Sequence, residues 1–227
     1  MLPSSIRALI QAICFVLPWG IRRRILARAF GYKIDRSAYI GMSIILADEA
    51  ILGANARIGS FNYIGRLDRL VLGEAAWIGA YNWIVGLSKS QNSPFFKSKA
   101  NRRSDLILGR GASIANSHLI DCTDAIEIGE LSGVAGWRSQ ILTHGIDVIR
   151  MRQTCAPVII GANCMTATGA IIMKGVTIAP YTIVGAGSVV TKSVREPYTI
   201  VVGNPAVFVR NVPTTAGYFH RATGPIY

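Results

Sequence analysis

Aliphatic residues recur at every sixth position along much of the chain. The first unbroken run of these anchor positions comprises Ile34, Ile40, Leu46, Leu52, Ile58 and Ile64. The residue after an anchor is small in most of these hexads, as at Gly41, Gly53 and Gly59. A period of six fits neither the 3.6-residue turn of an α-helix nor the two-residue alternation of a simple strand. It fits a flat-sided coil, in which each hexad supplies one short strand with an inward anchor and one corner where a small residue lets the backbone turn.

The hexads continue, with two-residue slips and two longer interruptions, to about residue 194. The later anchors are Leu72, Ile78, Ile84, Leu108, Ile114, Ile120, Ile126, Ile128, Val134, Ile160, Thr166, Ile172, Ile178, Val184 and Val190. Three hexads would close one triangular coil, and about seven coils stacked at ~4.8 Å would form a prism roughly 30 Å tall. The pattern therefore predicts an all-β parallel β-helix over residues 34–194. The alternative is an ordinary buried β protein with fortuitous spacing.

The repeat also has a family likeness in its C-terminal third. The segment Ile178-Ala-Pro-Tyr-Thr-Ile-Val-Gly-Ala-Gly-Ser-Val-Val-Thr-Lys192, with the Ile-Gly hexads before it, resembles the hexapeptide-repeat acyltransferases, and sugar or polysaccharide O-acetyltransferases in particular. The resemblance implies a left-handed parallel β-helix, usually a homotrimer, that uses acetyl-CoA as the acyl donor. The left hand comes from the resemblance alone, because general crossover rules favour the right hand.

Four segments fall outside the hexads. Residues 1–33 form a separate segment that we expect to be helical. Residues 195–227 form a C-terminal extension, and loop insertions interrupt the repeat near 86–107 and 145–158. The first segment carries no acid and six basic residues: Arg7, Arg22, Arg23, Arg24, Arg28 and Lys33. Its apolar run from Leu9 to Leu17 is too short to span a bilayer. It is either a cap on the first coil alone or a cap that also contacts an anionic membrane.

Composition narrows the class of protein further. The 227 residues suit one domain, and an apolar share of 51% against 16% charged residues excludes a disordered chain. The formal net charge of +12 favours an anionic partner. We do not expect a nucleic acid, because the sequence has no recognised binding motif and half of the excess charge lies in residues 1–33. The four separated cysteines suggest neither disulfides nor a zinc site, and so a reducing, cytoplasmic setting.

His144 is the candidate catalytic residue. The chain has 3 histidines, and His144 lies in Ile141-Leu-Thr-His-Gly-Ile-Asp147, where the repeat stops and a loop leaves the coil. A histidine has an unperturbed pKa near the working range of a general base. A corner histidine with local hydrogen bonds is the structural alternative. Asp147 could orient the imidazole or be a solvated loop acid.

The resemblance also implies residues that bind the two substrates. The candidate acceptor-binding residues are Asn116, Asp121 and Asn82, each of which could instead be a turn or corner residue. The candidate residues for the CoA donor are Thr168, Ala186, Thr191, Lys192 and Arg210. Small residues would leave room for the pantetheine arm, and Lys192 would offer a charge to phosphate. For Arg210 a solvated charge is the alternative.

The resemblance, together with the position of His144, implies direct acyl transfer. His144 would take a proton from a saccharide hydroxyl or amine, which attacks the thioester of acetyl-CoA, while a backbone N–H stabilises the oxyanion. Polysaccharide or glycolipid biosynthesis is the role that the resemblance implies, in the cytoplasm or at the inner face of the membrane. The alternatives are a non-catalytic β-helix scaffold and a metal-dependent enzyme of the γ-carbonic-anhydrase type. We expect no metal, because the latter needs clustered histidine ligands and His118, His144 and His220 are widely separated.

Overall fold

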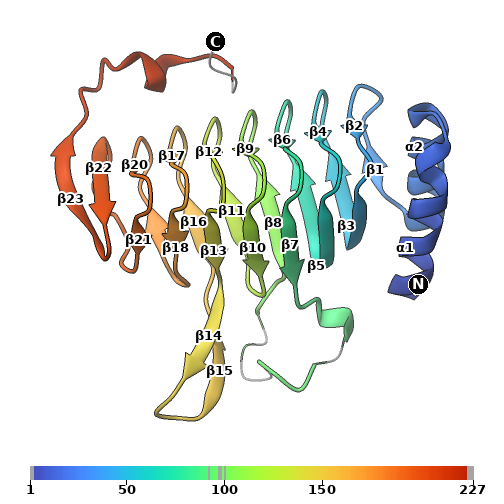
Figure 1. Cartoon of the computed structure of the whole chain (residues 1–227), viewed down its shortest axis with the longest axis horizontal. Helices are drawn as coiled ribbons and strands as arrows, with labels where there is room; N and C mark the ends of the chain where they lie inside the picture. The colour runs from blue at the N-terminus through green and yellow to red at the C-terminus, as the bar shows by residue number, and fades with distance from the viewer. Residues whose placement is uncertain (1–2, 92, 97–98, 100, 224–227) are drawn as a thin grey trace.

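The computed structural model describes residues 3–91, 93–96, 99 and 101–223. It is a three-faced parallel β-helix with two helices at one end and a hairpin and a loop projecting from one side (Figure 1). The predicted all-β fold with an N-terminal helical segment is confirmed.

Parallel ladders of short strands make the three faces of the prism. The first face consists of β1 (Lys33–Ile34), the second halves of β3 (Ile44–Leu52) and β5 (Tyr63–Leu72), β8 (Asp105–Leu108), β11 (Ile126–Ile128), β16 (Val158–Ile160) and β19 (Thr177–Ile178). The second face consists of β2 (Tyr39–Ile40), β4 (Arg57–Ile58), β6 (Trp77–Ile78), β9 (Ser113–Ile114), β12 (Gly133–Val134), β17 (Met165–Thr166), β20 (Ile183–Val184) and β22 (Thr199–Gly203). The third face consists of the first halves of β3 and β5, then β7 (Trp83–Gly86), β10 (Leu119–Cys122), β13 (Gln140–Leu142), β18 (Ile171–Ile172) and β21 (Val189–Val190).

The anchors fill the interior of the prism, as their spacing predicts. Ile58, Ile64 and Ile84 have no measurable exposure, and most other anchors are similarly buried. The prediction of Leu46 as an anchor is wrong. Ile45 instead occupies the interior position opposite Ile64. The corner between Leu46 and Ala47 contains a register shift, so this coil departs from a strict period of six.

The N-terminal segment caps the first coil through hydrogen-bond donors. It consists of α1 (Ser4–Ile13), a short 3₁₀ helix (Cys14–Val16) and α2 (Trp19–Phe30). N–H groups of the first coil donate to the second coil, as Tyr39 does to Ala56 and Gly41 does to Ile58, while other carbonyls of the first coil face the open end. Donors from the segment reach these carbonyls: Arg7 to Ala47, Gln11 to Ile45, Trp19 to Ala38, Arg22 to Gly41 and Arg23 to Ile34. The cap therefore needs donor side chains, which explains why arginine is frequent there.

The other end of the prism is closed by an antiparallel strand. β23 (Ala206–Asn211) pairs with β22 after a tight reversal at Gly203. The chain then passes back along the prism (Figure 1) and ends, within the described residues, after a 3₁₀ helix at Gly217–His220. The Arg221 guanidinium holds this return by donating to the carbonyl of Leu131.

Both interruptions of the repeat leave the prism at the same corner, between the third and first faces. The first is the loop between β7 and β8, which includes a short 3₁₀ helix at Lys89–Gln91. The second is a hairpin of β14 (His144–Asp147) and β15 (Arg152–Cys155). The structure thus gives the second predicted loop regular antiparallel pairing. Figure 1 shows the loop and the hairpin projecting in the same direction.

Candidate active site

His144 begins the hairpin at the point where β13 ends. Its side chain is 45% exposed, whereas the preceding Thr143 is fully buried. The Thr143 hydroxyl donates to the carbonyl of Asp121 and accepts from the N–H of Asp124. Thr143 thus fastens the corner to the coil before it, and His144 is the first residue free to leave the prism.

Asp121 holds the imidazole in a fixed orientation. Its Oδ2 lies 2.6 Å from His144 Nδ1 and accepts the backbone N–H groups of Thr143 and His144 at 2.9 and 3.0 Å. Burial by itself would raise the pKa of Asp121, but hydrogen bonds from Thr123 and His144 outweigh it and lower the pKa below its usual value. An ionised carboxylate only accepts, so Nδ1 carries the proton of the neutral imidazole. Nε2 is therefore the basic nitrogen.

Thr123 connects this pair to the loop between β7 and β8. Its hydroxyl donates to Asp121 Oδ1 at 2.6 Å, and its carbonyl accepts from the buried guanidinium of Arg102. Arg102 also lies 5.5 Å from the centre of the Phe96 ring, within the range of a cation–π interaction. The aromatic part of the loop is thus fixed next to the imidazole.

A cavity of about 380 Å³ opens beside His144. It is lined by Arg66, Trp83, Val85, Gly86, Leu87, Phe95, Phe96, Leu119, Ile120, Asp121, Thr123, His144 and Gln153. The walls thus combine one histidine–carboxylate pair with aromatic and aliphatic side chains and with the polar residues Arg66, Thr123 and Gln153. Such a cavity offers a small molecule apolar walls and one imidazole that can accept a proton.

Asp147 does not reach the imidazole. It accepts from the backbone N–H and the guanidinium of Arg150 at 3.1 and 3.2 Å, and Arg152 lies 4.0 Å away. These bonds lower its pKa and stabilise the turn of the hairpin. In this structure Asp121, and not Asp147, orients the imidazole of His144.

The donor candidates lie at two corners. Thr191 and Lys192 follow β21, as Lys174 follows β18 and His144 follows β13, so they share the corner of His144 on successive coils about 4.8 Å apart. Lys174, which the sequence analysis missed, donates to Thr154 of the hairpin. Thr168 and Ala186 lie on the other side of β18 and β21, and the N–H of Gly187 donates to the Thr168 carbonyl. Arg210 is apart from both, exposed on β23.

Two acceptor candidates serve as corner residues. Asn82 is 2% exposed and donates to Asn62 Oδ1 and to the carbonyl of Ala115. Its own oxygen accepts the N–H of His118. Asn116 lies at the same corner, where its oxygen accepts the N–H of Ala80 at 2.7 Å. The structure does not bring either residue to His144 within one chain.

The remaining histidines are separate from His144. His118 is buried, and its Nδ1 accepts the N–H of Ser139 at 3.0 Å, while burial lowers its pKa. His220 Nε2 lies 2.7 Å from the carbonyl of Thr214.

Among the described residues, no group of three or more His, Cys, Asp or Glu side chains could hold a metal ion. The four cysteines are free and buried.

The C-terminal part of the coil resembles the hexapeptide-repeat transferases in sequence. The sequence profile described as "Bacterial transferase hexapeptide (six repeats)" matches residues 157–192, which contain β16 to β21. The resemblance stated from the sequence is thereby confirmed, and this match is consistent with the left-handed coil that it implies.

Known proteins with similar sequences are named acetyltransferases. A "Putative acetyltransferase" of Staphylococcus aureus (strain COL) is 38% identical over 60 residues, which cover 26% of this chain and 30% of that protein. Another, from Schizosaccharomyces pombe, is 41% identical over 56 residues, or 25% of this chain and 27% of that protein. The matched part thus spans less than a third of the length of these relatives.

A solved structure extends the comparison to the whole fold. The polysialic acid O-acetyltransferase OatWY superposes with a TM-score of 0.52 at 18% identity, over 83% of this chain and 94% of that one. At this identity the likeness concerns the fold alone.

Proposed function

We propose that the protein is an acyl-CoA-dependent acyltransferase that moves an acetyl group from acetyl-CoA to a hydroxyl or amino group of a saccharide. The observation that carries the proposal is the His144–Asp121 pair at 2.6 Å, at the mouth of a cavity on a hexapeptide-repeat coil. The names of the related acetyltransferases support the same chemistry. The proposed role is in polysaccharide or glycolipid biosynthesis, at the cytoplasmic side of a membrane.

His144 acts as the general base in the proposed reaction. Its Nε2 takes the proton of the acceptor hydroxyl as the oxygen attacks the thioester carbonyl. The new C–O bond forms, the C–S bond breaks, and the imidazolium returns the proton to the leaving CoA thiolate. Asp121 holds Nδ1–H and stabilises the imidazolium charge without itself taking the proton.

The donor is proposed to lie along the corner that His144 shares with later coils. Lys174 and Lys192 supply positive charge there, which suits the phosphates of CoA. Thr168, Ala186 and Arg210 lie elsewhere on the chain, so they contact the donor only if it crosses the third face or lies between two copies of the chain. Asn116 and Asn82 have no place in the proposal for a single chain, because the side-chain oxygen of each already accepts a backbone N–H group of the coil.

The proposal includes a trimer and a membrane surface. The trimer follows from the family resemblance, and it would cover the third face of each prism. Contact with an anionic membrane follows from the outer side of α1, where Ile6, Leu9 and Ile13 are exposed, as is Val16 just after it. The exposed Arg24 and Arg28 of α2 are suitable partners for anionic headgroups. No helix in the described part of the chain is long and apolar enough to cross a membrane.

The test is product analysis. The enzyme is incubated with acetyl-CoA and a panel of nucleotide-linked and lipid-linked saccharides, and products are identified by mass spectrometry. We expect one saccharide class to gain an acetyl group, and His144→Ala to lower turnover on the order of a hundredfold or more. Circular dichroism should show an unchanged fold, because His144 is half exposed. Near-normal turnover of a folded His144→Ala variant would refute the assignment of the base.

A further inference from the structure

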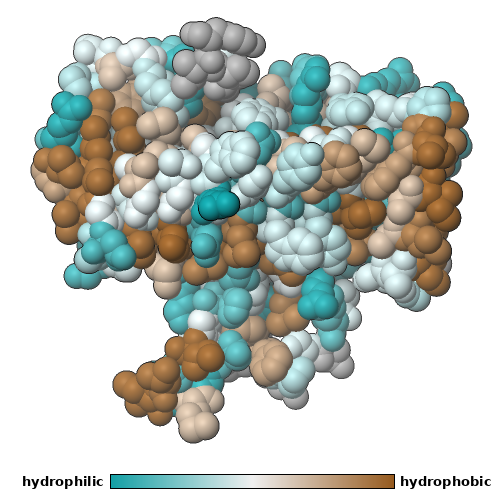
Figure 2. All heavy atoms as spheres, in the orientation of Figure 1, coloured by the Kyte–Doolittle hydropathy of each residue, from teal (hydrophilic) through white to brown (hydrophobic). Residues whose placement is uncertain are grey.

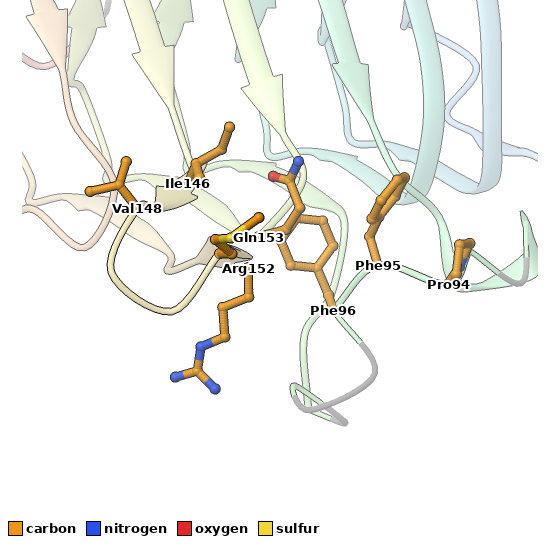
Figure 3. Close-up of a pocket in the computed structure, with 8 residues that line it drawn as sticks. Pro94, Phe95, Phe96, Ile146, Val148, Arg152 and Gln153 are labelled. Atoms are coloured by element: carbon orange, nitrogen blue, oxygen red, sulfur yellow. The ribbon is translucent and has the colours of Figure 1, made fainter.

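A second, larger cavity lies between the loop and the hairpin. Its volume is about 690 Å³, and it is lined by Pro94, Phe95, Phe96, Ile146, Val148, Met151, Arg152 and Gln153 (Figure 3). Most of these side chains are apolar. The volume falls in the range of small-molecule sites, about 300–1,000 Å³. The proposed reaction at His144 does not use it.

The hairpin side of this cavity exposes apolar side chains to an unusual degree. Val148 is 79% exposed and Met151 is 90% exposed. Figure 2 shows hydrophobic atoms gathered at the tip of the projection that the hairpin forms. A contiguous apolar surface on a projecting element is typical of a binding site, because exposing it to water without a ligand is unfavourable.

The two cavities share a wall. Phe95, Phe96 and Gln153 line both the apolar cavity and the cavity that contains His144. Figure 3 shows Phe96 pointing toward the hairpin, next to Gln153. One ligand can therefore place a polar end at the imidazole and an apolar end between the loop and the hairpin.

The structure holds both walls in position. Four residue pairs join β14 to β15. On the opposite wall, Asp68 accepts the N–H groups of Lys89 and Ser104 at both ends of the loop, and Ser88 donates to Asp48. Arg102 then links the Phe96 ring to Thr123. The cavity is thus built from anchored elements.

The charge of the lining indicates an uncharged occupant. Arg152 is the one charged residue among those that line the cavity, and Figure 3 shows its guanidinium pointing away from the Phe96 ring. Its guanidinium lies instead within 4.0 Å of Asp147. An aliphatic chain fits such a lining, whereas a second sugar or a phosphate would find few polar partners there.

We propose that this cavity binds the apolar part of the acceptor, so that the acceptor is a saccharide attached to an alkyl or prenyl chain. The inference rests on the proposed acyltransferase function and specifies its substrate class. The reacting hydroxyl lies at His144 Nε2, and the chain extends past Phe95 and Phe96 toward Val148 and Met151.

Binding is tested first, without any turnover. Octyl β-D-glucoside, below its micelle concentration, is added to the full-length protein, and saturation-transfer NMR is recorded. We expect strong transfer to the octyl protons in the wild type and at least a threefold weaker signal in the double variant Val148→Thr, Met151→Gln. The control is Ile149→Thr, because Ile149 lies between these positions and is 92% exposed but does not line the cavity.

Turnover is tested second, with acetyl-CoA and the octyl glycoside or the free form of the best saccharide acceptor. We expect the octyl glycoside to be favoured at least tenfold in kcat/KM, mainly through KM. The double variant should lose most of this preference and keep its activity on the free saccharide. The Ile149→Thr control should behave as wild type.

The inference would be overturned, with the proposed function left intact, by equal kcat/KM for the octyl glycoside and the free saccharide, or by an effect of Ile149→Thr equal to that of the double variant. A change of sedimenting mass in the double variant would also overturn it, because the cavity would then bind a second copy of the chain. If the octyl protons show transfer but no saccharide is acetylated, the proposed function fails while the apolar site remains.

Discussion

At the scale of single residues, Asp121 determines what His144 can do. One oxygen of Asp121 accepts three N–H groups of residues 143 and 144, and the other accepts the N–H and hydroxyl of Thr123. Both oxygens are thus saturated with donors. The carboxylate stays ionised and fixes both the tautomer and the direction of the imidazole.

Replacing this carboxylate by an amide should impair the reaction without removing the histidine. In Asp121→Asn the amide –NH₂ would face the N–H and hydroxyl donors that now bond to the carboxylate. The imidazole tautomer that has its proton on Nδ1 and a free Nε2 would then no longer be stabilised. We expect turnover to fall on the order of tenfold or more. The matched control is Asp147→Asn on the hairpin, where the aspartate pairs with Arg150 instead, and turnover should remain near the wild-type value. Equal losses in both variants would contradict the positioning role.

The same carboxylate should make stability depend on pH. The pKa of Asp121 is lower in the folded protein than its usual value. Its contribution to the free energy of unfolding is therefore complete above the unfolded pKa, about 3.9, and is lost as the pH falls through the folded pKa. Urea unfolding at pH 6 and pH 3 should show the wild type losing more stability than Asp121→Asn. An equal loss in both proteins would contradict the proposed protonation.

The sequence showed the context of His144, whose catalytic role stays a prediction. His144 is the histidine that directly follows a repeat segment and begins an insertion, which places it at a corner beside a cavity. The role of Asp121 was not visible, because it depends on Asp121 lying opposite Leu142 on the next coil, a register that the hexad pattern with its slips does not give. Asn82 and Asn116 are of a residue type that is common in binding sites. In the folded coil, however, both side chains form hydrogen bonds with groups of neighbouring coils.

At the scale of elements, the N-terminal helices satisfy the open end of the β-helix. Their donors reach carbonyls that have no coil to pair with. The sequence predicted a cap, either alone or with its basic residues at an anionic membrane. Arg22 is instead buried, with its guanidinium near the rings of Phe15 and Trp19. The number of arginines in the sequence therefore does not show which of them donate hydrogen bonds to the β-helix and which are exposed and able to contact a membrane.

This division of the arginines predicts unequal effects on stability. Arg22→Ala leaves the Gly41 carbonyl without its donor at 2.7 Å, so we expect a loss of about 1–3 kcal/mol in the free energy of unfolding. Arg24→Ala, which removes an exposed charge from the same helix, should change it by less than about 0.5 kcal/mol. Urea denaturation measures both. Similar values for the two variants would argue against the capping role.

The outer side of α1 is the element proposed to meet a membrane. We expect the wild type to float with anionic vesicles, and Ile13→Asp to reduce the bound fraction several-fold, because the substitution places a charge in the apolar surface. Ala12→Asp is the control, since it adds the same charge at an exposed position beside that surface. Absence of wild-type binding to anionic vesicles would remove the membrane contact from the proposal.

At the scale of the whole molecule, the six-residue period determines the fold because each inward aliphatic residue stacks on its equivalent in the next coil. The glycines that follow the anchors leave little room between coils: a Cβ on Gly129 would lie 2.6 Å from the backbone of Gly161 and Ala162. These two requirements are local and repeat along the chain, so the sequence reveals them. The hairpin and the loop have no period, and their shared cavity depends on contacts between distant segments.

Aromatic side chains on the outside of the prism give the expected trimer a testable surface. Tyr81 and Trp137 are each 62% exposed and Trp83 is 56% exposed, all on or beside the third face. Interfaces between proteins are enriched in such residues. We expect the wild type to sediment at three times the 24.5 kDa chain mass and Tyr81→Glu to sediment as a monomer with reduced turnover. Val16→Glu, an equal change at an 87% exposed apolar residue of the cap, should leave the mass unchanged. A monomeric wild type with full turnover would place the complete active site within one chain.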